Sequence, residues 1–84
     1  MLIRRKSDLI CREVDGKLVG LDLRSSRYFS LNPTGTFLWR LLDTGAETEA
    51  LVDALVDSGK IDREVARTDV DRFVDSLREQ ELLE

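Results

Sequence analysis

The N-terminal part of the chain alternates apolar and polar residues in short runs, which is the period of two typical of β-strands. Asp15-Gly16 lies between the first two runs, and Asp-Gly between apolar runs is a strong hairpin signal. We therefore predict strands over residues 9–14, 18–23 and 27–31. Their short connections predict an antiparallel meander. By alternation, Val19, Leu21 and Leu23 lie on one face of the second strand, and Phe29 and Leu31 lie on one face of the third.

The pattern changes to a helical period directly after the third strand. Asn32 is a preferred N-cap residue, and Pro33 fits the first helical position, where its missing N–H costs nothing. Gly45 is expected to close this helix, whose predicted apolar stripe is Phe37, Leu38, Leu41 and Leu42. Trp39 lies off the stripe, which predicts either a second contact or partial exposure.

Two further helices are predicted from the remaining apolar spacing. One covers about residues 47–58 and ends at Gly59, and the other follows a capping Asp62 and covers about residues 63–80. Their core positions are Leu51, Val52, Leu55 and Val56 in the first, and Ala66, Val70, Phe73, Val74 and Leu77 in the second. The predicted fold class is therefore α+β: a winged helix-turn-helix-like arrangement, with a three-stranded antiparallel meander followed by three helices.

The composition is that of a small globular protein, with 84 residues of which 42% are apolar and 36% charged. No apolar stretch approaches the roughly 18 residues of a membrane span, and the basic start Arg4-Arg5-Lys6 lacks the apolar segment of a secretory signal. We expect a single domain over residues 1–84, a cytoplasmic location and no membrane partner. The basic cluster is expected to be a solvated terminal arm.

The side chains that most enzymes use are scarce. The chain has no histidine and Cys11 is its only cysteine, which excludes a Ser-His-Asp triad, a Cys-His pair and an internal disulfide. Thiolate or imidazole zinc clusters are nearly excluded, and no glycine-rich phosphate loop is present. Cys11 lies in a predicted strand, where a free cysteine packs as a small hydrophobe. We expect no enzyme activity, no catalytic residue, no metal and no cofactor.

The charge disfavours a nucleic-acid partner, although winged helix proteins ordinarily place the last helix in a DNA groove. The net charge is −4. The predicted last helix carries the acidic residues Asp62, Glu64, Asp69, Asp71, Asp75 and Glu79 against the basic residues Arg63, Arg67, Arg72 and Arg78. An acidic helix repels phosphate, so we expect no nucleic-acid binding, and a DNA-binding regulator stays an alternative.

The third predicted strand offers a different kind of site. In a meander it has a single neighbour, so one row of its N–H and C=O groups has no partner. Stable monomers usually protect such an edge with proline, an inward-facing charge or a covering loop, and residues 27–31 have none of these apart from Arg27 at the entrance. The edge is suited to an incoming peptide that pairs as a fourth strand, whereas dimerisation or simple solvation of the edge is the alternative.

Residues 26–42, with the sequence SRYFSLNPTGTFLWRLL, are followed by Gly45 and a closing helix that reaches Leu82-Leu83. Together they resemble the PqqD-like family of recognition elements for ribosomally made, modified peptides. Within this family, the strand-Leu-Asn-Pro-Thr-Gly-helix signature and the stand-alone length are most similar to the lasso-peptide precursor-recognition subunit. A pyrroloquinoline quinone pathway carrier of the same fold is the close alternative.

The resemblance implies a non-catalytic protein that binds the leader segment of a precursor peptide and presents it to a separate leader peptidase. Family members hold the leader as an added strand against the third strand and the last helix. Carried onto this sequence, the strand role falls on Arg27, Tyr28, Phe29, Ser30 and Leu31, and the helix role on Asp69, Val70, Arg72, Phe73 and Ser76.

Overall fold

The main sheet has three antiparallel strands in the order β2-β3-β4, within a computed structural model that describes residues 2–59 and 61–84. The strands are β2 (Leu9–Val14), β3 (Lys17–Asp22) and β4 (Arg27–Leu31). Asp15-Gly16 forms the β2–β3 turn, and its φ angles of 53° and 78° are the left-handed values that a two-residue hairpin turn requires. The predicted meander is confirmed, although β3 begins and ends one residue earlier than predicted, which leaves Leu23 outside the strand.

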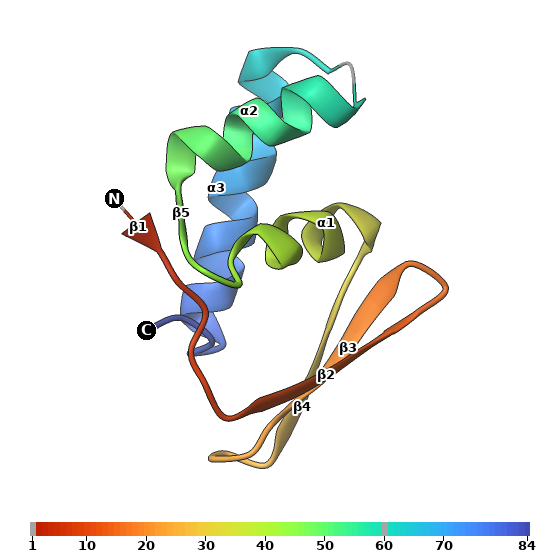
Figure 1. Ribbon diagram of the computed structural model, residues 1–84, viewed down its shortest axis with the longest axis vertical. Helices are drawn as coiled ribbons and strands as arrows, with labels where there is room; N and C mark the ends of the chain where they lie inside the picture. The colour runs from red at the N-terminus through yellow and green to blue at the C-terminus, as the bar shows by residue number, and fades with distance from the viewer. Residues whose placement is uncertain (1, 60) are drawn as a thin grey trace.

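The helices that follow are α1 (Pro33–Leu41), α2 (Thr48–Gly59) and α3 (Arg63–Glu79). They lie on one side of the sheet, with α1 between the sheet and α2 (Figure 1). This arrangement confirms the predicted α+β fold class. Two short strands that the sequence did not predict, β1 (Leu2–Ile3) and β5 (Ala46–Glu47), pair antiparallel at the start of α2. No helix of the described residues is long and apolar enough to cross a membrane.

The helix-facing side of the sheet is buried and the opposite side is exposed. Leu18, Phe29 and Leu31 point to the helices and belong to the core. Phe29 of β4 is the pairing partner of Gly20 of β3, and a Cβ atom at position 20 would lie 2.2 Å from the Phe29 ring. Glycine is therefore needed here so that the ring can lie across β3 and reach Trp39, at a centroid distance of 5.6 Å.

Helix α1 begins as predicted but buries a different stripe. The Asn32 side chain accepts a hydrogen bond of 2.8 Å from the Gly35 N–H, which confirms the N-cap. The expected burial of Leu41 is wrong, because its side chain is 37% exposed, whereas Trp39 is 1% exposed. Of the two alternatives for Trp39, the second contact is correct: the Arg5 guanidinium lies over its ring, 5.3 Å from the centroid. A helix covered from two sides buries a wider stripe than one covered by the sheet alone.

The prediction of a solvated N-terminal arm is also wrong. Arg5 bridges to Leu83 in the C-terminal tail and pairs with Asp43, so it is only partly exposed. The Lys6 Nζ atom lies 2.7 Å from the Asp22 Oδ2 atom, and Asp22 is 3% exposed. A buried carboxylate needs a partner, so the basic segment is held against the sheet by a contact distant in sequence.

Helices α2 and α3 carry the stripes that their spacing predicted. Most of the predicted positions are buried, and Val56 is half-buried. Asp62 has the extended backbone of an N-cap residue, but its side chain makes no capping hydrogen bond. Cys11 lies in β2 as expected, although it is exposed rather than packed as a small hydrophobe.

Candidate peptide-binding site

The free edge of β4 presents the main-chain groups of Tyr28 and Ser30. The Ser26 N–H donates to the Asp22 carbonyl at 2.8 Å, and the Leu18 N–H donates at 2.8 Å to a hydroxyl that also reaches Leu31. Alternate residues of β3 thus point toward β4, and their partners in β4 point back. Because neighbouring residues of a strand alternate, Tyr28 and Ser30 direct their N–H and C=O groups to the edge beside which the described residues place no strand.

This edge opens into a hollow between β4 and α3, which we name the β4–α3 groove. It consists of two depressions of about 340 Å³ and about 180 Å³. The larger is lined by Ser30, Leu31, Asn32, Thr34, Gly35, Asp69, Arg72, Phe73 and Ser76. The smaller is lined by Asp22, Arg27, Tyr28, Phe29, Glu79, Gln80 and Leu82. Together they run along the whole of β4, so a strand paired with the edge would lie over both.

The structure brings nine of the ten predicted site residues to this groove, counted from the two sets of lining residues. Val70 is the exception, because its side chain is fully buried in the core. Tyr28 is 77% exposed on the outer face of the sheet, so its main chain rather than its ring faces the groove. Phe29 and Phe73 are largely buried and form an apolar floor.

Several lining residues were not predicted. Glu79 and Gln80 lie three and four residues after Ser76, so helical spacing alone would have extended the predicted face of α3 to them. Thr34 and Gly35 belong to the helix start that the sequence identified, but they were assigned only a role in that start. Nothing in the sequence indicated that Asp22 would line the groove, because its partner Lys6 is distant along the chain.

The charges around the groove are available to a ligand. Within residues 2–59 and 61–84, no ion pair engages Arg27, Asp69, Arg72 or Glu79. Asp69 is half-buried and the other three are exposed. The groove therefore combines an apolar floor, unpaired main-chain groups and a mixed charged rim. No group of three or more His, Cys, Asp or Glu side chains in the described residues could hold a metal ion.

One end of the groove is stabilised by an ion pair that should respond to acid. Lys6 donates a hydrogen bond to the Asp22 carboxylate and holds its pKa below the usual range, although burial opposes this, and the Arg24 N–H adds to the lowering. Such a group stabilises the fold above its unfolded pKa of about 3.9, and this contribution is lost as the pH falls through the folded value.

We expect the Asp22→Asn variant to be less stable than the wild type at pH 7 and to lose less stability between pH 5 and about pH 2. The measurement is urea denaturation across this range. Glu13→Gln is the control, because Arg40 likewise lowers the pKa of Glu13 but that pair is exposed, so its effect should be smaller. An unchanged pH dependence in Asp22→Asn would contradict the assignment.

Residues 17–83 match the family described as coenzyme PQQ synthesis protein D, PqqD. The chain belongs to the PqqD family. The structure of TbiB1 in complex with the TbiA(beta) leader peptide is similar, with a TM-score of 0.87, 31% sequence identity, and coverage of 96% of this chain and 94% of that one. A lasso peptide synthetase B1 complexed with the leader peptide aligns with a TM-score of 0.83 and 26% identity, over 98% of this chain and 96% of that one. No curated protein sequence matches significantly.

These similarities confirm the sequence-based identification of a PqqD-like recognition element. The PqqD family match begins at Lys17 and so takes in β3, β4 and all three helices. Both structural matches extend over nearly the whole chain, β2 included.

Proposed function

We propose that this PqqD-family chain binds the leader segment of a ribosomally made precursor peptide as a strand added to β4. It then delivers the leader to a separate peptidase in lasso-peptide biosynthesis. In this proposal residues 1–84 act as one recognition domain in the cytoplasm and catalyse no reaction themselves. The observation that carries the proposal is the free β4 edge opening into the β4–α3 groove.

The groove suits a disordered peptide better than a small molecule. Tyr28 and Ser30 offer up to four main-chain hydrogen bonds, each worth about 0.5–1.5 kcal/mol net. Strand addition takes its affinity from such bonds and its specificity from pockets that accept alternate side chains. The two depressions provide such pockets, and the unpaired charges at the rim would fix the register.

The alternative partner is the peptide of a pyrroloquinoline quinone pathway, which the description of the family favours. The B1 proteins of 31% and 26% identity, both in complex with leader peptides, favour the lasso assignment. Binding assays with both kinds of peptide would separate the alternatives, because recognition of a leader depends on its side chains as well as on its main chain.

Delivery requires a second surface for the peptidase, and we assign it to the outer face of the sheet. This face exposes Ile10, Val14, Val19 and Tyr28, with exposed fractions between 43% and 77%. Exposed apolar side chains gathered on one face are typical of an interaction site. The face borders the β4 edge, since the side chains of Tyr28 and Ser30 belong to it, so a peptidase seated there would meet the bound leader.

We expect the wild type to bind a fluorescent leader peptide of the precursor encoded beside its gene, with micromolar or tighter affinity in a polarisation titration. Asp69→Ala should weaken binding by about tenfold, because a half-buried carboxylate loses a charged hydrogen bond. Arg72→Ala should weaken it by up to about fivefold, because this side chain is exposed.

Asp71→Ala is the matched control, because Asp71 is exposed on α3 and does not line the groove. Added salt should have a modest effect, since buried apolar anchors rather than rim charges dominate affinity. A wild type that fails to bind the leader refutes the proposed function. If Asp69→Ala and Arg72→Ala bind the leader as well as the control does, the leader binds to another face of the protein.

A further inference from the structure

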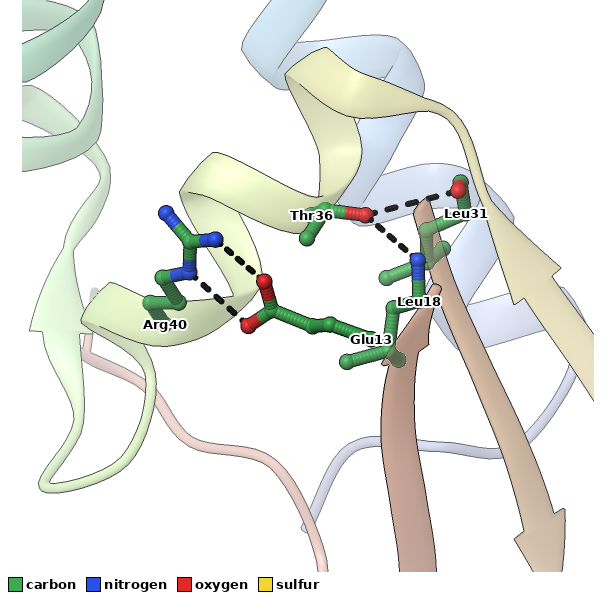
Figure 2. A network of polar contacts seen from close by, with 5 residues as sticks. All are labelled: Glu13, Leu18, Leu31, Thr36 and Arg40. Atoms are coloured by element: carbon green, nitrogen blue, oxygen red, sulfur yellow. Dashed lines mark hydrogen bonds and ion pairs between the residues drawn. The ribbon is translucent and has the colours of Figure 1, made fainter. Parts of the chain in front are cut away.

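The last pair of the ladder between β3 and β4 is Leu18 and Leu31, and one side chain of α1 bonds to both residues. The Leu18 N–H donates to the Thr36 hydroxyl oxygen at 2.8 Å. The same hydroxyl donates to the Leu31 carbonyl at 3.4 Å. Thr36 thus joins α1 to the start of β3 and the end of β4 (Figure 2).

This bridge is buried, so its hydrogen bonds are obligatory. Thr36 is 1% exposed and Leu18 is 3% exposed. Because the Thr36 oxygen accepts from the Leu18 N–H, its own proton is free to turn to the Leu31 carbonyl, which fixes the orientation of the hydroxyl. Without the hydroxyl, the buried Leu18 N–H and the Leu31 carbonyl each lose a hydrogen-bond partner.

The position of this bridge connects it to the groove. Leu31 and Gly35 line the larger depression, and both are joined to Thr36, the first by the hydrogen bond and the second by the peptide bond. Phe73 of α3 lies across the same depression. Loss of the bridge would release the end of β4 from α1 and change the orientation of the edge at Ser30, because Ser30 directly precedes Leu31.

We propose that Thr36 is a positioning residue for the peptide-binding edge, which it sets by fastening the start of β3 and the end of β4 to α1 through its hydroxyl group. This inference rests on the proposed function, since it concerns the same groove. It assigns to Thr36 an effect on leader affinity that is separate from the effect on stability that any buried hydrogen bond has.

A second contact between α1 and the hairpin provides a comparison. Arg40 forms two hydrogen bonds to the Glu13 carboxylate, so it also fastens α1 to the sheet (Figure 2). Both side chains are exposed and neither lines the groove. Breaking this contact loosens the attachment of α1 without freeing the Leu18 N–H.

The test compares Thr36→Val, which keeps the shape but removes the hydroxyl, with Thr36→Ser, which keeps the hydroxyl. Leader affinity is measured by fluorescence polarisation and the melting temperature by circular dichroism. We expect Thr36→Val to bind the leader about tenfold more weakly than the wild type, and Thr36→Ser to bind within about twofold. Arg40→Gln and Thr44→Val, an exposed threonine away from the groove, should bind as the wild type does.

Two results would overturn the proposal: Thr36→Val that melts earlier but binds the leader as the wild type does, or Thr36→Ser that binds as weakly as Thr36→Val. If Thr36→Val does not fold, Thr36→Ala is judged by the same criterion. A wild type that does not bind the leader refutes the proposed function instead. Amide exchange of the free protein then still tests the bridge, because the Leu18 amide should exchange faster in the hydroxyl-free variant than in the wild type and in Thr36→Ser.

Discussion

Replacing Ser30 with proline should abolish most of the leader binding while the fold survives. The Ser30 N–H faces the free edge, so its loss breaks no hydrogen bond within the sheet, and proline is tolerated in edge strands at such positions. In the complex, the loss leaves a carbonyl of the leader buried without a donor, which costs about 1–3 kcal/mol. The expected rise in Kd is therefore between about fivefold and about a hundredfold.

The control for this variant is Ser30→Ala, which removes the hydroxyl but keeps the main-chain N–H. It should bind the leader nearly as the wild type does, because strand pairing depends on main-chain groups. Circular dichroism and a melting curve establish that Ser30→Pro is folded, and a polarisation titration gives its Kd. Strand addition to β4 is wrong if folded Ser30→Pro keeps the wild-type affinity, or if Ser30→Ala loses as much affinity as Ser30→Pro.

Local patterns were enough to predict the edge that these variants test. Alternation and the Asp15-Gly16 turn located the strands, and Asn32-Pro33 located the start of α1, because each signal acts within a few residues. The order of a meander then leaves its last strand at the edge of the sheet, as observed for β4. Most of the predicted site residues line one groove for the same reason.

The features that the sequence did not reveal depend on contacts between distant segments. The β1–β5 pair has two residues in each strand, too few to show a period. Arg5 lies over the Trp39 ring and Lys6 pairs with Asp22, so no pattern within α1 or β3 alone predicts the burial of Trp39 or Asp22. Val70 was assigned both to the apolar stripe of α3 and to the leader-binding face, and only the first assignment is correct, because the stripe packs into the core.

The second prediction with a large expected effect concerns delivery of the leader to the peptidase. We expect leader removal by the partner peptidase to be slow without this protein and to accelerate on the order of 10²-fold when it is added at saturating concentration, because tethering replaces a bimolecular encounter by a nearly intramolecular one. The measurement is a cleavage assay of the precursor with purified peptidase, with and without the protein. Free leader peptide should compete and slow the stimulated reaction, since it occupies the same groove.

A variant on the outer face separates delivery from binding. Ile10 lies on β2, the strand farthest from the binding edge, and is 59% exposed. Ile10→Lys should therefore keep the leader affinity but lose most of the acceleration, since it places a charge in the surface assigned to the peptidase. Leu41→Lys is the matched control, because it puts the same charge on an exposed apolar residue of α1. Delivery by tethering is refuted if cleavage is equally fast without the protein, and the assignment of the outer face is refuted if Ile10→Lys stimulates the peptidase as well as Leu41→Lys does.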